Sequence, residues 1–519
     1  MKYVSVSEMV EIEKAADRAG HSYSDMMEAA GKGLAGEIQK RYDQNTGSRA
    51  LALVGSGNNG GDALVALDYL MQWGWKASAL LLRQRTENDP LLKRVAEQGG
   101  KVLDASNPDS LEAILAGELS GCTVLLDGVL GTGIKLPLRA PLVELLALTG
   151  RKLSWIEHPP EVVAVDCPSG IDCDTGEAAP VVLKADLTVT MAAVKSGLLK
   201  FPAYNYIGDL ALVDIGLPGG LSEWESINRE VIERGWVAER IPERPLNAHK
   251  GTFGTALILA GSKELPGAAI LAGKSAYRVG AGLVTIGVPA NIQLALVSGI
   301  PEATWIVLDN GDQGLQESAV EQVRRALGRP TACLLGPGWG RGTSTRKFLA
   351  GVLNLDGLPP LVIDADGLRQ LAEFPDWPRK LPRRSVLTPH PGEMSGLCGL
   401  SIPEIQSDRV GTAERFAREW SQIVLLKGAH TVIAAPEGQT KILISAEPAL
   451  ARAGSGDVLA GIITGWIAQG LEPFSAAAVG AWLHARSGKE AESRAGSPAA
   501  VLAGDISKAI GQALGGLVN

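Results

Sequence analysis

Short apolar runs alternate with helix-like stretches along most of this sequence, and that alternation constrains the fold more than any other feature. Two series occur, the first between residues 51 and 217 and the second between 255 and 436: LALVG, KASALLL, CTVLLD, EVVAVD, ADLTVT and DLALVDIGL, then TALILAGS, GLVTIGV, ACLLGPG, LVIDAD, SVLTPH, IVLLKG and TVIAAP. Strands separated by helices are typical of βαβ units around a mostly parallel sheet. The sequence therefore predicts an α/β protein.

A segment rich in glycine, proline and charge, residues 215–249, interrupts this rhythm. A chain of 519 residues is also longer than one hydrophobic core usually serves. We therefore expect two domains, residues 1–218 and 230–519, joined by a linker at 219–229. The glycine motifs of the two series differ and no fixed period relates them, so a tandem repeat is not expected.

Charge and cysteine content narrow the class of protein. The formal net charge is −8 and no basic stripe is visible, which argues against a nucleic-acid partner. The five cysteines are scattered without a C-x-x-C pair, which favours free thiols in a reducing cytoplasm. The longest apolar stretches, such as VLAGIITGWIA, are too short to span a membrane, and the first residues do not read as a signal peptide. We expect a cytoplasmic enzyme.

The stretch GSGNNGGD at residues 55–62 contains G-x-G-x-x-G between an apolar run and a helix-like run. Glycines allow backbone N–H groups to approach a phosphate, and a helix N-terminus adds partial positive charge. A redox dinucleotide site would require an acid about 20 residues later. Arg83 and Arg85 stand there instead. From these residues alone, a tight turn, an NADP site and another phosphate site all remain open.

Two further polar loops follow apolar runs of the first series. Asp127 precedes a second glycine turn, and Asp166 precedes Ser169. The carboxyl ends of parallel strands meet at one edge of a sheet, so these loops should converge with the first glycine loop. Oxygen atoms of Asn58, Asp127 and Ser169 would suit a hard monovalent or divalent cation.

The second series ends in a sharper motif, AGSGDVLAG at residues 453–461. Gly454 and Gly456 open a helix whose N–H groups can stabilise a developing anion, and Asp457 lies in its first turn. An acid beside an anion hole has the chemistry of a general base that activates a hydroxyl group. Further polar strand ends are Asp364 with Asp366, and His390 with Glu393. The P-loop pattern G-x-x-x-x-G-K-[ST] is absent from the sequence.

The motifs GSGNNGGD, DGVLGTG, AVDCPSGID and VTMAAVKSGLL, within residues 8–215, resemble the N-terminal domain of the YjeF family, an NAD(P)H-hydrate epimerase. The resemblance implies a Rossmann-like parallel sheet that binds NADH or NADPH hydrated at C6 of the nicotinamide as a damaged substrate. It implies that Asp166 is catalytic and that Asn58, Asp127 and Ser169 bind potassium. The implied substrate-binding residues are Asn58, Asn59, Gly60, Gly61, Asp62, Gly131, Thr132, Gly133, Ile134, Lys135, Leu136, Pro137 and Asp166. Ala63 and Val194 depart from this family, which usually has glycine and proline at these positions.

The motifs NAHKGTFG, AGLVT, GPGWG, TPHPGE, KGAHTVI and AGSGDVLAG, within residues 230–515, resemble the ribokinase-like superfamily. Within it they are similar to the ADP- or ATP-dependent NAD(P)H-hydrate dehydratases, which implies a ribokinase-like α/β domain, catalytic Asp457, and Mg²⁺ with ADP or ATP. Trp339 replaces the more usual leucine. The residues implied to bind the hydrated nucleotide are Ala281, Gly338, His390 and Asp457. Those implied to bind the adenine nucleotide are Lys427, Gly428, Ala429, His430, Thr431 and Gly456.

The two resemblances together imply a bifunctional repair enzyme, an isomerase and hydro-lyase in one chain. The N-terminal domain would interconvert the R and S forms of hydrated NADH and NADPH, and the C-terminal domain would dehydrate the S form at the expense of ADP or ATP. Its partners would be small molecules, and the chain would form a homo-oligomer. Two alternatives are a ribokinase-like kinase for a vitamin precursor or sugar with a binding-only N-terminal domain, and a nucleotide-sensing scaffold without catalysis.

Overall fold

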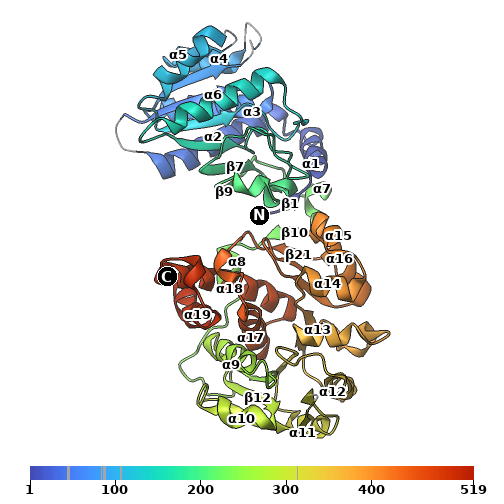
Figure 1. Cartoon of the computed structure of the whole chain (residues 1–519). Coiled ribbons are helices and arrows are strands. Elements are labelled where there is room, and N and C mark those ends of the chain that lie inside the picture. Colours follow the sequence, from blue (N-terminus) through green and yellow to red (C-terminus); the bar gives the residue numbers. More distant parts are fainter. Residues whose placement is uncertain (44–46, 83–84, 86–88, 106–107, 313, 519) are drawn as a thin grey trace. The chain divides into compact units, whose positions relative to one another are not determined.

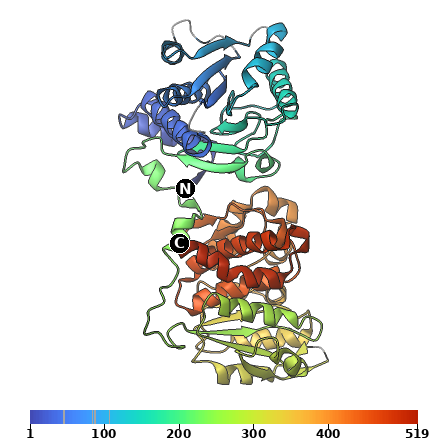
Figure 2. The same cartoon turned by 90° about the vertical axis from the view of Figure 1, so that its left-hand side faces the viewer.

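The computed structural model describes residues 1–43, 47–82, 85, 89–105, 108–312 and 314–518. The chain divides into two compact units, Met1–Arg229 and Glu230–Asn519. Figures 1 and 2 present both units, coloured along the sequence. Each unit is an α/β body around its own parallel sheet, so the predicted fold class and the presence of two α/β domains are confirmed.

The first unit is built on one parallel sheet, which within the described residues has seven strands in the order β4-β3-β2-β5-β6-β7-β9. Its strands are β2 (Arg49–Val54), β3 (Lys76–Leu81), β4 (Lys101–Asp104), β5 (Val124–Gly128), β6 (Glu161–Val165), β7 (Leu187–Met191) and β9 (Asp209–Val213). The chain order reverses between β2 and β5. In open parallel sheets, ligands bind outside the carboxyl ends of the strands at such a reversal.

Helices cover both faces of this sheet (Figure 1). They are α1 (Val6–Arg18), α2 (Tyr23–Tyr42), α3 (Asn58–Gln72), α4 (Pro90–Glu97), α5 (Pro108–Leu119), α6 (Ala140–Ser154) and α7 (Ser222–Glu225). Because successive strand residues point to opposite faces, Ala50, Ala52 and Val54 of β2 pack with α1, α2 and α3. Leu51 and Leu53 pack with α5 and α6 on the other face. Both faces are buried, as parallel sheets require.

A two-strand parallel ladder ties the N-terminus to the end of the sheet. β1 (Tyr3–Val4) pairs with β8 (Val194–Lys195), with Val4 opposite Lys195. A capping box at Ser5 and Glu8 then starts α1. The N–H of Val194 donates to the carbonyl of Lys2 at 2.9 Å. The backbone of residues 194–195 is therefore held against the N-terminal strand.

The second unit has a sheet of ten strands in the part of the chain that is described, in the order β10-β21-β20-β19-β18-β17-β16-β11-β12-β13. From β19 to β13 the strands are parallel, and β20 and β21 are antiparallel additions. The strands are β10 (Arg229–Val231), β11 (Thr255–Leu259), β12 (Leu283–Pro289), β13 (Thr304–Leu308), β16 (Ala332–Leu335), β17 (Leu361–Ile363), β18 (Val386–Leu387), β19 (Ile423–Leu426), β20 (Val432–Ala434) and β21 (Thr440–Ile442). A short antiparallel pair, β14 (Asn310–Gly311) and β15 (Gly314–Leu315), lies apart from the sheet.

Two helical layers enclose this sheet (Figure 2). One layer contains α9 (Gly267–Arg278), α10 (Ala290–Val297), α17 (Ser455–Ala468), α18 (Pro473–Ala495) and α19 (Ala503–Val518), with α8 (Arg234–Ala238) beside it. The other contains α11 (Ala319–Ala326), α12 (Thr343–Leu353), α13 (Asp366–Leu371), α14 (Pro391–Cys398), α15 (Ile402–Ser407) and α16 (Arg409–Trp420).

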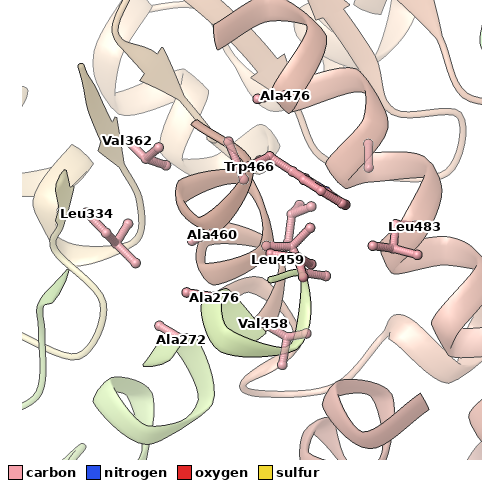
Figure 3. Packing of buried hydrophobic residues seen from close by; sticks show 14 of the residues in the cluster. Ala272, Ala276, Leu334, Val362, Val458, Leu459, Ala460, Trp466, Ala476 and Leu483 are labelled. Atoms are coloured by element: carbon pink, nitrogen blue, oxygen red, sulfur yellow. The ribbon is translucent and has the colours of Figure 1, made fainter. Parts of the chain in front are cut away.

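Helix α17 is the centre of the larger core (Figure 3). Its residues from Val458 to Trp466 lie between α9, α18 and strands β16 and β17. Backbone and helix approach closely at Gly461, where a Cβ would lie 2.3 Å from the carbonyl oxygen of Ala272 on α9. Because no side chain of α17 separates the two helices at this crossing, their close contact fixes the direction of α17. It thereby fixes the position of the glycine motif at the N-terminus of α17.

All thirteen apolar runs that were predicted as strands are strands, from β2 through β20. Among the described helices, none combines the length and apolar character needed to cross a membrane.

Two candidate active sites

The first glycine loop connects β2 to α3 at the point where the strand order reverses. Its glycines allow neighbouring backbone segments to approach one another closely. A Cβ on Gly55 would lie 1.9 Å from the carbonyl oxygen of Val129, and one on Gly60 would lie 2.1 Å from that of Gly55. Gly57 caps α3 without a side-chain hydrogen bond, and a Cβ there would meet open space. The N-terminus of α3 is thus held close to the β5 loop and opens towards a cavity.

The side chain of Arg85 stabilises the first glycine loop. Its Nη1 donates to the carbonyl oxygen of Gly55 at 2.8 Å, and its Nε lies 2.6 Å from Oδ2 of Asp89. The guanidinium is thereby engaged by the protein's own groups, which leaves little of it for a 2′-phosphate. Arg83 lies outside the described residues.

Two cavities adjoin the loops that follow β2 and β5. One, of about 600 Å³, is lined by most of the predicted epimerase residues, namely Asn58, Asn59, Asp62, Gly131, Thr132, Gly133, Ile134 and Asp166. The other, of about 590 Å³, is lined by Lys135, Leu136 and Pro137. Both share Ser56, Gly133 and Ile134. Gly60 and Gly61 line neither cavity, because they face the protein: a Cβ on Gly61 would lie 2.6 Å from Sδ of Met27.

Asp166 follows β6 and lies in the left-handed region, with φ of 62°. Its Oδ1 accepts hydrogen bonds from Nζ of Lys195 at 2.5 Å, from the N–H of Met191 at 3.0 Å and from the hydroxyl of Thr190 at 3.0 Å. The Lys195 side chain is 2% exposed. A buried ion pair therefore lies at the wall of the first cavity.

Two more carboxyl groups line the same cavity, Glu13 from α1 and Asp62 from α3. Burial raises the pKa of Glu13, against the opposing effect of Lys195. Burial, with smaller contributions from Asp166 and Glu13, raises the pKa of Asp62 well above its usual range. A neutral Asp62 can donate a hydrogen bond to a phosphate, whereas a charged one would repel it.

The predicted cation ligands are brought together in part. The Ser169 hydroxyl donates to Oδ1 of Asp127 at 2.5 Å, and its N–H donates to Oδ2 at 2.8 Å. Asp127 is fully buried, and in the described part of the chain it forms no ion pair with lysine or arginine. Asn58 is exposed at the cavity rim. Carboxylate, hydroxyl and amide oxygens are a donor set that a hard cation can use.

The second site lies at the N-terminus of α17. Gly454 caps the helix with φ of 88°, which favours glycine. Burial, followed by the neighbouring Asp364, raises the pKa of Asp457 to about 7, while Lys427 opposes this shift. A carboxyl group with this pKa at a helix N-terminus is suited to accept a proton near neutral pH.

Charged side chains from three neighbouring strand ends surround this motif. Nζ of Lys427 lies 2.6 Å from Oδ1 of Asp364 and 3.6 Å from Oε2 of Glu393. Burial alone would lower the pKa of Lys427, but these carboxylates outweigh it and the pKa is raised. A Cβ on Gly456 would lie 3.6 Å from both Oδ2 of Asp364 and Nζ of Lys427. The glycine motif therefore faces a set of charges in which the cation of Lys427 lies between the carboxylates of Asp364 and Glu393.

His390 caps α14. Its Nδ1 accepts the N–H groups of Gly392 at 3.0 Å and Glu393 at 3.1 Å, and its Nε2 lies 3.3 Å from Oε1 of Glu393. Burial lowers the pKa of His390. Because Nδ1 accepts hydrogen bonds from these N–H groups, the proton of the neutral ring lies on Nε2. The ring of His390 can therefore orient groups around the site through this N–H.

The turn at Lys427–Thr431 joins antiparallel strands β19 and β20, as its strand-turn-strand pattern predicts. Gly428 has φ of 149°, and a Cβ there would lie 2.9 Å from the guanidinium of Arg409. The Thr431 hydroxyl donates to the carbonyl of Gly428 at 2.9 Å. His430 is buried with φ of 54°, and Ala429 is exposed at the tip.

Gly338 lies at the carboxyl edge of the sheet, after β16, but Ala281 does not join it. Ala281 precedes β12, and β12 runs parallel to β11 and, through it, to β16. It therefore lies at the amino edge, away from Gly338, His390 and Asp457. Ala268, in the first turn of α9, lies beside Gly338 instead, 2.9 Å from where its Cβ would be.

Three residues at these sites were missed by the sequence reasoning. Lys195 lies within a motif that was used for the resemblance, but nothing in its spacing indicates contact with Asp166. Glu13 is one of several acids on an amphipathic helix and carries no sequence signal. Ala268 follows the turn ELPG after β11, a signal that could have been read as a helix start at a strand's carboxyl end.

Two parallel-sheet units, each with an acid beside a glycine-opened helix at the carboxyl edge, are typical of α/β nucleotide-binding enzymes. Family models agree with this division. Residues 23–197 match the YjeF-related protein N-terminus, and residues 256–512 match NAD(P)H-hydrate dehydratase.

Relatives match nearly the whole chain. The bifunctional NAD(P)H-hydrate repair enzyme of Moorella thermoacetica is 36% identical over 93% of this chain and 90% of its own length. That of Escherichia coli is 33% identical over 91% and 86%. A crystal structure of the ADP/ATP-dependent NAD(P)H-hydrate dehydratase from Bacillus subtilis, with ATP and Mg²⁺, is 31% identical, covers 56% of this chain and 100% of that chain, and has a TM-score of 0.49.

The chain belongs to the family of bifunctional NAD(P)H-hydrate repair enzymes. The predicted family and the predicted enzyme class, an isomerase joined to a hydro-lyase, are confirmed.

Proposed function

We propose that the first unit interconverts the C6 epimers of hydrated NADH and NADPH, and that the second unit dehydrates the S epimer with ADP or ATP. The observation that carries this proposal is the pair of separate acid sites, Asp166 at the cavity of the first unit and Asp457 at the N-terminus of α17. One site per unit suits two reactions that occur in sequence on the same coenzyme.

In the first unit, the C6 hydroxyl and N1 of the hydrate form a hemiaminal. Asp166 accepts the hydroxyl proton, the C6–N1 bond breaks as C6=O forms, and the proton passes to N1. After rotation of the aldehyde, N1 attacks C6 from the other side and the proton returns to oxygen. The substrate phosphates would lie at the N-terminus of α3 and the turn Gly131–Ile134.

A potassium ion fits the first unit by the chemistry of Asp127 and Ser169, because a fully buried carboxylate without a cationic side chain beside it favours a bound cation. Asn58 would complete the set from the rim. Such an ion would supply positive charge near the substrate phosphates.

In the second unit, Asp457 accepts the proton of the C6 hydroxyl while that oxygen attacks the terminal phosphoryl group of the nucleotide, and the bond to the departing nucleotide breaks. The N–H groups at residues 454–456 stabilise the transferring phosphoryl group. The N1 electron pair then expels phosphate from C6, and loss of a C5 proton restores the dihydropyridine. The turn Lys427–Thr431 and Gly456 would hold the adenine nucleotide, and Gly338, His390 and Ala268 the hydrate.

Mg²⁺ would reach this site with the nucleotide. In the described part of the chain, no group of three or more His, Cys, Asp and Glu side chains has the geometry of a metal site. The nucleotide phosphates and water would therefore supply most Mg²⁺ ligands, as is usual for this ion. The ion would neutralise charge on the phosphates.

We also propose that the enzyme acts in the cytoplasm, where its five cysteines would stay reduced; all five are free thiols. The use of ADP or ATP as the nucleotide and the assembly of the chain into a homo-oligomer are predictions from the resemblance.

The test is incubation of a mixture of both epimers of hydrated NADH with the full chain, ADP and Mg²⁺, with absorbance of the dihydropyridine as readout. The wild type should convert both epimers and release phosphate. Asp166→Asn should convert only the S form, Asp457→Asn neither form, and a mixture of the two variants both forms. A stable phosphorylated product without regained absorbance would instead indicate a small-molecule kinase.

A further inference from the structure

The two carboxylate oxygens of Asp166 are used differently. Oδ1 accepts all three of the hydrogen bonds described above, from Lys195, Met191 and Thr190. Across the described residues, Oδ2 has no protein partner, and Asp166 lines the cavity of about 600 Å³. The oxygen that remains for a ligand is therefore Oδ2.

Lys195 has no donor left for a ligand. Its Nζ lies 2.5 Å from Oδ1 of Asp166, 2.8 Å from the carbonyl oxygen of Met191 and 3.3 Å from the hydroxyl oxygen of Thr190. An ammonium group has three protons, and these three acceptors engage them. Lys195 is also 1% exposed and does not line the cavity. Its direct contact with a residue that lines the cavity is the one to Oδ1 of Asp166.

The backbone of Lys195 is also held by pairing. Lys195 lies opposite Val4 in the β1–β8 ladder, and the preceding residue, Val194, is bonded to Lys2. The ammonium group is thus fixed before any substrate binds, and so is the oxygen of Asp166 that it engages.

The described residues that line the cavity include no lysine or arginine, and the cation paired with one of its acids is Lys195, behind Asp166. Glu13 on α1, Asp62 on α3 and Asp166 after β6 bring three carboxyl groups to one cavity. Nearby acids disfavour one another's ionisation, and a cation in contact favours the ionised form of the acid that it touches. Lys195 touches Asp166 and neither of the other two.

We propose that Lys195 is the positioning residue of the epimerase site: it engages Oδ1 of Asp166, so that Oδ2 meets the C6 hydroxyl and N1 of the substrate. This inference rests on the proposed epimerase function.

The test compares Lys195→Met and Lys195→Gln with Lys200→Met in the full chain. Lys200 is a matched control, because its Nζ donates at 2.8 Å to the carbonyl of Asp174 and has no bond to Asp166. The rate of epimerisation is measured by chromatographic separation of the two epimers, with the uncatalysed rate subtracted, at several substrate concentrations to give kcat and KM. The dehydratase rate of each variant reports that the chain is folded.

Both Lys195 variants should lower kcat about 100-fold while KM changes less than about 3-fold. A third variant, Lys195→Ala, leaves space for an added amine. A primary alkylammonium ion should restore part of the epimerisation rate to this variant and none to Asp166→Asn. Lys200→Met should behave as the wild type.

The proposal is overturned if the kcat of Lys195→Gln matches that of the wild type, or if the rate of the lysine variants falls without rescue by amine, since a purely structural lysine would give that second result. If Lys195→Met fails to fold, Lys195→Gln, which keeps polar donors, carries the test. A wild-type chain that does not epimerise the hydrate would overturn the proposed function instead.

Discussion

Ala63 occupies the space that Gly128 leaves free. A Cβ on Gly128 would lie 2.7 Å from the Cβ of Ala63, closer than two carbon atoms can approach. Ala63 is fully buried in α3, one turn after the glycine loop, and Gly128 follows Asp127 at the end of β5. The departure of this chain from the family's usual glycine at position 63 is therefore accommodated by the glycine opposite.

Gly128→Ala should lower the free energy of unfolding of the first unit by about 2 kcal/mol or more, because the added methyl group overpacks the α3–β5 contact. Ala63→Gly alone should cost about 1 kcal/mol, as glycine does within a helix. The double variant should be more stable than the sum of the two changes predicts, by about 1 kcal/mol. Thermal and denaturant unfolding measure this coupling, and additive effects would show that the two positions do not share space.

The dehydratase rate should depend on pH through Asp457. Burial and Asp364 raise the pKa of Asp457 to about 7, and only the deprotonated carboxylate can accept the hydroxyl proton. The value of kcat/KM for hydrated NADH should therefore fall as pH drops below about 7 and level off above it. Asp364→Asn removes a charge that raises this pKa, so its limb should lie at lower pH. A limb that does not move would assign it to another group.

Lys427 should matter for stability as well as for nucleotide binding. Lys427→Met leaves Asp364 buried without its cation, and removing one partner of a buried pair typically costs about 3–5 kcal/mol. Lys508→Met is the control, because Lys508 and Asp505 form an exposed pair on α19, worth less than about 1 kcal/mol. Denaturant unfolding of the full chain, followed by probes in the second unit, compares the two. Equal losses would contradict the buried role of Lys427.

Epimerase activity should require potassium. At constant ionic strength, replacing K⁺ by tetramethylammonium should lower the rate about tenfold or more, while the dehydratase reaction on the S epimer, measured with the same chain, reports effects unrelated to the first unit. Asp127→Asn should be slow in both salts, because the buried carboxylate is the charged ligand. If the wild-type rate is the same in both salts, the cation assignment is wrong.

The sequence predicts the central strands of both sheets but misses several strands at or near the edges. All of the predicted runs are strands, and most of them are central parallel strands, which are buried on both faces and read as continuous apolar runs. The missed strands include β4, β10, β13 and β21, which lie at or near the edges of their sheets. β4, for example, exposes Lys101, Val102 and Asp104, so no apolar run marks it.

The candidate sites divide in the same way. Asp166, Asp457 and the loops around them follow strands, and a parallel sheet brings the carboxyl ends of its strands together, so their convergence is predictable. The contact between Asp166 and Lys195 depends on the β1–β8 ladder, which joins residues 191 positions apart and has no local signal. Ala281 lies away from the second site for a related reason: it comes just before β12, and only the direction of that strand reveals which edge of the sheet it occupies.

A substitution at Gly461 tests whether the packing of α17 against α9 positions the second site. Gly461→Ala would place a methyl carbon 2.3 Å from the carbonyl oxygen of Ala272, and backbone cannot yield as a flexible side chain can. We expect α17 and α9 to separate, with the second unit less stable by about 2 kcal/mol or more and the dehydratase rate reduced by a larger factor than the epimerase rate. Gly511→Ala is the matched control: it is also a helical glycine, but a Cβ there meets nothing within 4 Å, so the substitution should stabilise α19 by up to about 1 kcal/mol. Unfolding curves and both reaction rates, measured on the same preparations, distinguish the two variants. A Gly461→Ala chain as stable and active as Gly511→Ala would mean that the close approach of α17 to α9 does not determine where Asp457 lies.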